Sequence, residues 1–300
     1  MSARLPGRPA RTPTWGRGPV AVARAAGSDA GAGRAGSVGA VLVAAALVPH
    51  TALLVPGAAG AADPLESVRV AAVAAARALM AASPDRLIVV APKPRGAPRR
   101  WAGEPRPSLA AAGIDDDGLG WAGHRDPTGP RRGARGESTP GADATVGGSV
   151  ALLLLRAAGW AGPVDVVTVA TEDSGRLHDL GADLVAGPER VALVLAATLS
   201  ARRGPDSPLP ADPRAATVDD AVLADLSDLG ATSVARLAAV PAELARELAI
   251  SAWGPWQVLL GALRPGTSGS REAATCVVHH VSSGGSGSGV RYAALSWRWA

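Results

Sequence analysis

The stretch that decides the fold begins with VLVAAALVPH at residues 41–50 and ends with LIVVAPK at residues 87–93. Both parts are short, continuous apolar runs, which are typical of strands buried on both faces of a parallel sheet. Between them, residues 64–82 favour a helix, because Asp63 is a suitable N-cap and Pro64 suits the first helical position. The stretch therefore predicts a strand, a crossover helix and a second strand. We expect the two strands to lie side by side, with His50 and Lys93 facing one crevice at their carboxyl ends.

Strand and helix patterns alternate along the rest of the chain. Further strands are predicted at residues 164–170, 190–197, 275–281 and 290–297, and further helices at residues 150–158, 174–186, 212–224, 234–239, 242–251 and 253–263. This alternation predicts an α/β fold, a mostly parallel central sheet with helices on both faces. We expect one domain at residues 39–300, with a long loop rich in Pro, Gly and Arg at residues 94–148.

The positive charge of the chain is concentrated in its first 38 residues. The whole chain carries a formal charge of +4, whereas residues 1–38 hold six Arg and one Asp, or +5, so the rest sums to −1. We therefore expect no nucleic-acid partner for the folded domain. The basic leader is suited to nucleic acid or anionic lipid. Its composition is more typical of a disordered segment, or of a start codon assigned too far upstream.

The N-terminal region also allows a second interpretation, as a signal peptide covering residues 1–62. A basic region, an apolar run and the small residues before Asp63 fit that pattern. Against it, Pro49-His50 interrupts the apolar run, which also serves as the first strand. We expect a cytoplasmic protein, with export as the alternative. No run approaches the roughly 18 apolar residues that a membrane span needs, so no membrane partner is expected.

Histidines are the first candidates for chemistry. His50 follows a strand end and a proline, a position that suits either a metal ligand or a proton carrier, or else a structural turn histidine. His279 and His280 are neighbours on a strand, so they point to opposite faces and cannot easily chelate one metal. His178 has no partner at chelating spacing, and His124 lies in the long loop.

Other candidate groups are weaker. Lys93 and Arg95 follow a strand end and suit either an anion or a solvated loop. Ser200 precedes Arg202-Arg203-Gly204 without a nucleophile-elbow pattern, which does not favour a hydrolase. Three further features favour structural roles. They are the single cysteine Cys276, the pair Trp253 and Trp256, and Gly31-Ala32-Gly33, which precedes the first strand and so forms no phosphate cradle.

Residues 46–56, ALVPHTALLVP, resemble the opening of proteins related to the class III extradiol ring-cleavage dioxygenases. The likeness continues through residues 84–90, 146–163, 190–204, 253–262 and 292–297, and is strongest to the actinobacterial branch of that superfamily. In active members, two histidines and one carboxylate hold Fe(II), and another histidine acts as acid and base. The resemblance therefore implies both the fold and the position of an iron site.

Carried over position by position, that site is incomplete. His50 matches the first ligand, whereas Lys93 stands where the second histidine is expected, and Ala201 stands where the acid/base histidine is expected. The carboxylate expected before the last helix has no counterpart in residues 252–256, and Glu243 and Glu247 lie one or more turns away. A single neutral histidine does not make an iron site.

Three hypotheses follow. The first is a superfamily member with a degenerate metal site and no cofactor, which binds a small aromatic ligand or acts as a scaffold, as a homo-oligomer. The second is an active non-haem Fe(II) dioxygenase, or another metal-dependent oxidoreductase, that acts on a catechol-like aromatic. Such an enzyme would complete its site from His124 or from a partner chain. The third is an exported binding protein.

Overall fold

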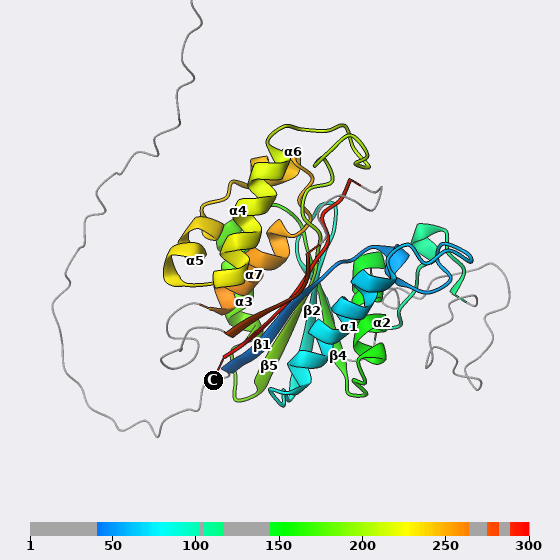
Figure 1. The fold of residues 1–300 in the computed structure, drawn as a ribbon. Coiled ribbons are helices and arrows are strands. Elements are labelled where there is room, and N and C mark those ends of the chain that lie inside the picture. The colour runs from blue at the N-terminus through cyan, green and yellow to red at the C-terminus, as the bar shows by residue number, and fades with distance from the viewer. Residues whose placement is uncertain (1–40, 103–104, 117–144, 264–274, 282–288, 300) are drawn as a thin grey trace, which may run out of the picture. The chain divides into compact units, whose positions relative to one another are not determined.

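A seven-stranded mixed sheet forms the centre of the computed structural model (Figure 1). The structure describes residues 41–102, 105–116, 145–263, 275–281 and 289–299. The strand order is β3-β4-β2-β5-β1-β7-β6. Four strands in its middle run parallel, and they are β1 (Val41–Val48), β2 (Arg86–Pro92), β4 (Val164–Val169) and β5 (Arg190–Ala196). The prediction of a mostly parallel sheet is thus confirmed only for its centre.

Antiparallel strands lie on both sides of this parallel core. One is β3 (Arg99–Trp101), which pairs with β4; the others are β7 (Ala293–Arg298), which pairs with β1, and β6 (Thr275–Val281), which pairs with β7. The strand β3 lies inside the predicted loop at residues 94–148. Its three residues include two arginines, so it has no apolar run that could have revealed it.

The first and second strands are not neighbours, and the prediction that they lie side by side is wrong. β5 lies between them: Val48 of β1 pairs with Ala196, and Val90 of β2 pairs with Leu195 on the other side of β5. A crossover helix fixes the direction of the next strand but leaves room for another strand in between. Local sequence therefore did not determine this strand order.

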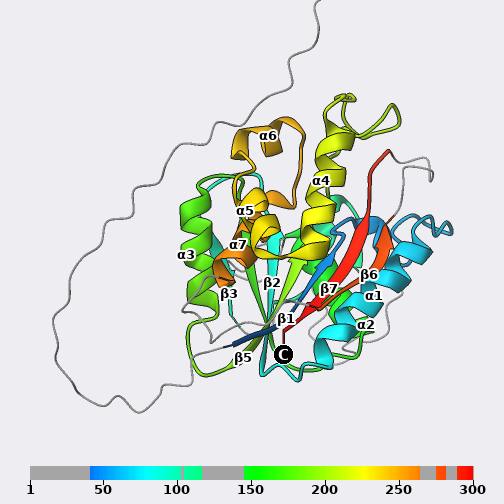
Figure 2. The same ribbon diagram turned by 60° about the vertical axis from the view of Figure 1, so that its left-hand side comes forward.

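Helices cover both faces of the sheet (Figures 1 and 2). One face carries α1 (Glu66–Met80) and α2 (Val146–Ala157), whose apolar residues form one core cluster with the sheet. The other face carries α3 (Ser174–Leu184), α4 (Ala215–Asp228), α5 (Ala231–Ala238), α6 (Ala242–Glu247) and α7 (Trp253–Ala262), which form a second cluster. Two short 3₁₀ helices, η1 (Ala52–Leu54) and η2 (Ala110–Ala112), lie in loops. Within these ranges no helix is both long and apolar enough to cross a membrane.

Helix starts differ from the sequence prediction in two places. Asp63 does not cap α1, whose N-cap is Leu65 without a side-chain hydrogen bond; the Asp63 carboxylate instead pairs with Arg69. α2 begins at Val146, four residues earlier than predicted, because the Thr145 hydroxyl accepts a 3.2 Å hydrogen bond from the Gly148 amide. Such a cap satisfies one of the free amides of the first turn.

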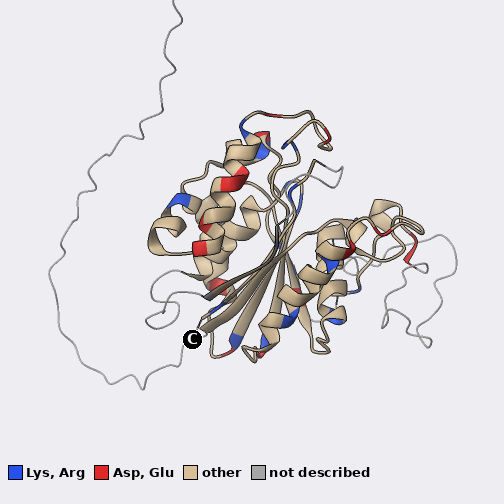
Figure 3. Cartoon of the chain, viewed as in Figure 1, with Lys and Arg blue, Asp and Glu red and all other residues tan. Residues whose placement is uncertain are grey.

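Trp253 and Trp256 lie fully inside the core, as predicted. The Trp253 indole donates a 2.8 Å hydrogen bond to the Val240 carbonyl, which satisfies its polar edge. Charged side chains lie mainly on the helices and loops and leave the sheet almost free of charge (Figure 3). The candidate polar groups are therefore gathered where the strands end.

Candidate functional site

The parallel strands β1, β2, β4 and β5 all end at one edge of the sheet, which we call the carboxyl edge. His50 follows β1, Lys93 follows β2, and the loop of residues 197–214 follows β5. Because β7 is antiparallel to β1, the chain enters β7 at the same edge, directly after Arg291. In open α/β sheets this edge is the usual place for ligands.

His50 lies against the start of α2. A Cβ atom added to Gly147 would lie 3.2 Å from the His50 Cβ and 3.4 Å from its Cδ2, so the glycine gives the imidazole room. The His50 Nδ1 is buried and has no hydrogen-bond partner among the described residues. Burial lowers the pKa of His50 to about 4, so that the imidazole is neutral at pH 7.

Lys93 closes its own loop. Its amide donates a 2.9 Å hydrogen bond to the Val169 carbonyl of β4, and its ammonium donates to the Ala97 carbonyl. The same loop is tied down by the Gly96 amide, which donates to Glu172 at 2.9 Å. Since β5 separates β1 from β2, the strands that lead to His50 and Lys93 lie two strand spacings apart, or roughly 10 Å. The structure gives the ammonium a partner other than His50.

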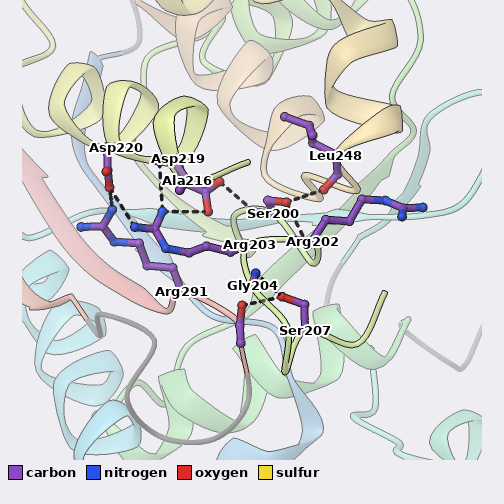
Figure 4. Close-up of polar contacts among 11 residues, drawn as sticks. Ser200, Arg202, Arg203, Gly204, Ser207, Ala216, Asp219, Asp220, Leu248 and Arg291 are labelled. Carbon is purple, nitrogen blue, oxygen red and sulfur yellow. Dashed lines mark hydrogen bonds and ion pairs between the residues drawn. The ribbon is translucent and has the colours of Figure 1, made fainter. Parts of the chain in front are cut away.

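Ser200 is a buried loop residue. Its hydroxyl donates to the Leu248 carbonyl at 2.7 Å and accepts from the Arg202 amide at 3.0 Å, while its own amide donates to Asp219 at 3.0 Å (Figure 4). The hydroxyl proton is therefore engaged, and the side chain is fully buried. This geometry supports a structural role and agrees with the absence of a nucleophile-elbow pattern. Ala201, the position of the expected acid/base histidine, follows directly in this loop.

Four charged side chains meet beside this loop (Figure 4). Arg203 contacts Asp219 at 3.5 Å and Asp220 at 3.3 Å, and it also donates to the Ala216 carbonyl at 3.1 Å. Arg291, which precedes β7, pairs with Asp220 as well. Asp219 is fully buried, and this burial raises its pKa, although the Ser200 amide and Arg203 act in the opposite direction. We call Arg203, Arg291, Asp219 and Asp220 the arginine cluster.

The other histidines do not complete a site with His50. His178 forms a 2.6 Å hydrogen bond with Gln257 between α3 and α7. His124 lies outside the described residues, as do the side chains of His279 and His280. Cys276 is half-buried, and burial raises the pKa of its thiol to about 11, in keeping with the predicted unreactive cysteine.

The described residues do not fit the iron site that the resemblance implies. No group of three His, Cys, Asp or Glu side chains in these ranges could hold a metal ion. Glu247 is bound to Arg214 at 2.9 Å on the surface, and Glu243 is exposed on α6. His50 is therefore the one residue of the implied iron site that the described part of the chain retains.

The arginine cluster was missed from sequence except for Arg203. Asp219 and Asp220 lie on α4, and Arg291 lies 88 residues beyond Arg203. One signal was available: an arginine pair after a strand end needs carboxylates nearby, and an Asp-Asp pair follows within twenty residues.

Comparisons with known proteins give little beyond this geometry. No protein-family model matches the chain, and no curated protein is significantly similar to it. The crystal structure of an uncharacterised protein from Escherichia coli K12 aligns with 85% of this chain and 99% of that chain, at 13% sequence identity and a TM-score of 0.40. A likeness at this level assigns no function, so the functional conclusion depends on the carboxyl edge itself.

Proposed function

We propose that this chain is a class III extradiol dioxygenase-like protein that has lost iron-dependent ring cleavage and binds a small aromatic molecule at its carboxyl edge. The observation that carries the proposal is His50, a neutral imidazole with a buried and unpartnered Nδ1. No further ligand for a metal accompanies it within the described ranges. An isolated neutral imidazole is a weak metal site but a good hydrogen-bond partner.

A phenolic ligand suits such a group. An unpartnered imidazole nitrogen in a buried place costs free energy, about 1–3 kcal/mol, until a ligand supplies a hydrogen bond. A phenol hydroxyl can donate or accept, so it matches either tautomer of the imidazole. The aromatic ring would add apolar burial.

Metal analysis tests this proposal. Protein purified without oxygen should contain iron and zinc far below one equivalent, measured by mass spectrometry, and should not open the ring of catechol when Fe(II) is supplied. Calorimetric titration should show that catechol binds to the wild-type chain about tenfold more tightly than to a His50→Ala variant. A His178→Ala variant is the matched control, because this histidine lies between α3 and α7. Stoichiometric metal that disappears in His50→Ala, or ring-opened product from catechol, would overturn the proposal.

A second candidate function rests on the same nitrogen atom. A buried, unpartnered Nδ1 also suits a metal ion whose other ligands come from His124 or from a second copy of the chain. That candidate is an active metal-dependent oxidoreductase that acts on a catechol-like aromatic, and the second route requires a homo-oligomer. Light scattering gives the oligomeric state, and loss of bound metal in a His124→Ala variant would favour this candidate over the first.

A further inference from the structure

We propose that Arg203 and Arg291 form a binding site for an oxyanion, the carboxylate or phosphate group of a small molecule, at the carboxyl edge. The inference rests on the proposed binding function and names the acidic group that the ligand carries. Its basis is the arginine cluster (Figure 4).

Arg291 has more donors than the structure satisfies. Its side chain is only 15% exposed, yet its Nε is buried without a hydrogen-bond acceptor among the described residues. Its Nη1 is directed at Asp220 as an ion pair. Buried guanidinium donors in proteins are almost always paired, so an unpaired one indicates a missing acceptor. An oxyanion supplies several acceptor atoms at once and is the natural partner of the guanidinium fork.

Acceptors are scarce throughout the cluster. Among the described residues, Ala216, Asp219 and Asp220 supply the acceptor atoms that contact the two guanidiniums, and one oxygen of Asp219 is already taken by the Ser200 amide. Two guanidinium groups carry ten donor hydrogens between them. The attraction for an anion therefore comes from unmet donors, since the formal charges of the four side chains balance.

Asp220 is the exchangeable member of the cluster. Its side chain is 56% exposed, and one of its oxygens faces both arginines, whereas Asp219 is fully buried and held by the Ser200 amide. Asp220 thus occupies the position that a ligand oxygen would take, and it can turn outward into solvent. We expect a ligand oxyanion to compete with this carboxylate.

The backbone holds Arg291 in place for this role. Two residues before it, the Gly289 carbonyl accepts a 2.9 Å hydrogen bond from the Ser207 hydroxyl, which itself accepts from the Gly204 amide at 2.8 Å. The loop that carries Arg203 is thereby fastened to the segment that carries Arg291. Such preorganisation lowers the entropic cost of binding.

Titration of the full chain with inorganic phosphate and with benzoate tests the site. We expect saturable binding of at least one probe at low salt by calorimetry. Binding should weaken about tenfold or more in Arg291→Ala, because a charge-assisted pair is lost. The matched control is Arg298→Ala, an exposed arginine at the opposite end of the same strand, which should bind as the wild type does.

Asp220→Asn separates a binding site from a structural salt bridge. Removing the competing carboxylate should tighten anion binding several-fold, and because Asp220 is exposed the variant should fold normally. Arg291→Lys keeps the charge but loses the fork, so it should bind more weakly than the wild type. Binding of phosphate alone, or of benzoate alone, supports the site and identifies the oxyanion.

Three results would overturn the proposal: no saturable binding of either probe by the wild-type chain, unchanged affinity in Arg291→Ala, or weaker binding in Asp220→Asn. These outcomes are independent of metal content and catechol turnover. A chain that holds iron would therefore contradict the proposed function and still leave the anion site to be decided by titration.

Discussion

The Ser207 hydroxyl donates a 2.9 Å hydrogen bond to the Gly289 carbonyl across 82 residues of sequence. Gly289 has a φ of +59°, and a Cβ atom placed on it would lie 2.2 Å from the Ser207 amide nitrogen and 2.4 Å from the Asp206 carbonyl carbon. The two backbones therefore meet without space for a side chain. This contact joins the loop after β5 to the segment before β7 and sets the position of Arg291.

Gly289→Ala should destabilise the protein by about 2–4 kcal/mol, because the alanine would be strained at positive φ and its methyl group would collide with backbone. Urea unfolding followed by circular dichroism measures the change in free energy. The control is Gly204→Ala in the same loop, where an added Cβ meets nothing within 4 Å. That variant should stay within about 0.5 kcal/mol of wild type. Equal effects of the two substitutions would show that the loop is not clamped at Gly289.

The contact between α3 and α7 depends on two more glycines. A Cβ on Gly181 would lie 2.0 Å from the Val258 carbonyl oxygen, and one on Gly261 would lie 2.1 Å from the His178 carbonyl oxygen. Gly181→Ala should therefore force the helices apart and cost about 3 kcal/mol or more, seen as a lower melting temperature. Asp183→Ala, at an exposed position of α3, is the control and should melt as the wild type does. A Gly181→Ala variant with unchanged melting would contradict this close packing.

The sequence predicted most elements of the fold but not their order in the sheet. β1, β4 and β5 are continuous apolar runs buried on both faces, and their predicted bounds differ from the observed ones by one residue at most. The place of β5 between β1 and β2 depends on packing over long distances, which no local pattern carries. The same holds for β3, which pairs with β4 although its sequence contains two arginines.

The candidate site was predicted in part, for a similar reason. A residue that follows a strand end can be located from local sequence, and this placed His50, Lys93 and Arg203 at one edge. Their partners come from distant segments: Gly147 gives His50 its space, and Arg291 joins Arg203 only because β7 runs antiparallel to β1. Asp219 is buried because the Ser200 loop folds over it, which its own helix does not reveal.

The position of β1 separates the cytoplasmic and exported alternatives. β1 pairs with β5 on one side and with β7 on the other, so a chain that begins at Asp63 lacks an inner strand of the sheet. We expect such a chain to be unfolded by circular dichroism, and a chain that begins at Val38 to unfold in urea as the full chain does. N-terminal sequencing of the native protein should find no start near Asp63. A native start there, with cooperative unfolding of the shortened chain, would favour export.

His50 should make stability depend on pH. In the unfolded chain its imidazole takes up a proton near pH 6.5, whereas in the folded protein burial lowers the pKa to about 4. Between these two values the unfolded state binds more protons, so the free energy of unfolding falls as the pH falls from 6.5 to 4. The full loss is about 3 kcal/mol, since each pKa unit corresponds to about 1.4 kcal/mol. A His50→Gln variant cannot titrate at this position. Its stability, measured by urea unfolding at steps from pH 7.5 to 4, should therefore fall less steeply than that of the wild type. If the two pH profiles stay parallel, the imidazole is not held neutral by burial, and the group on which the proposed binding function depends is exposed to water.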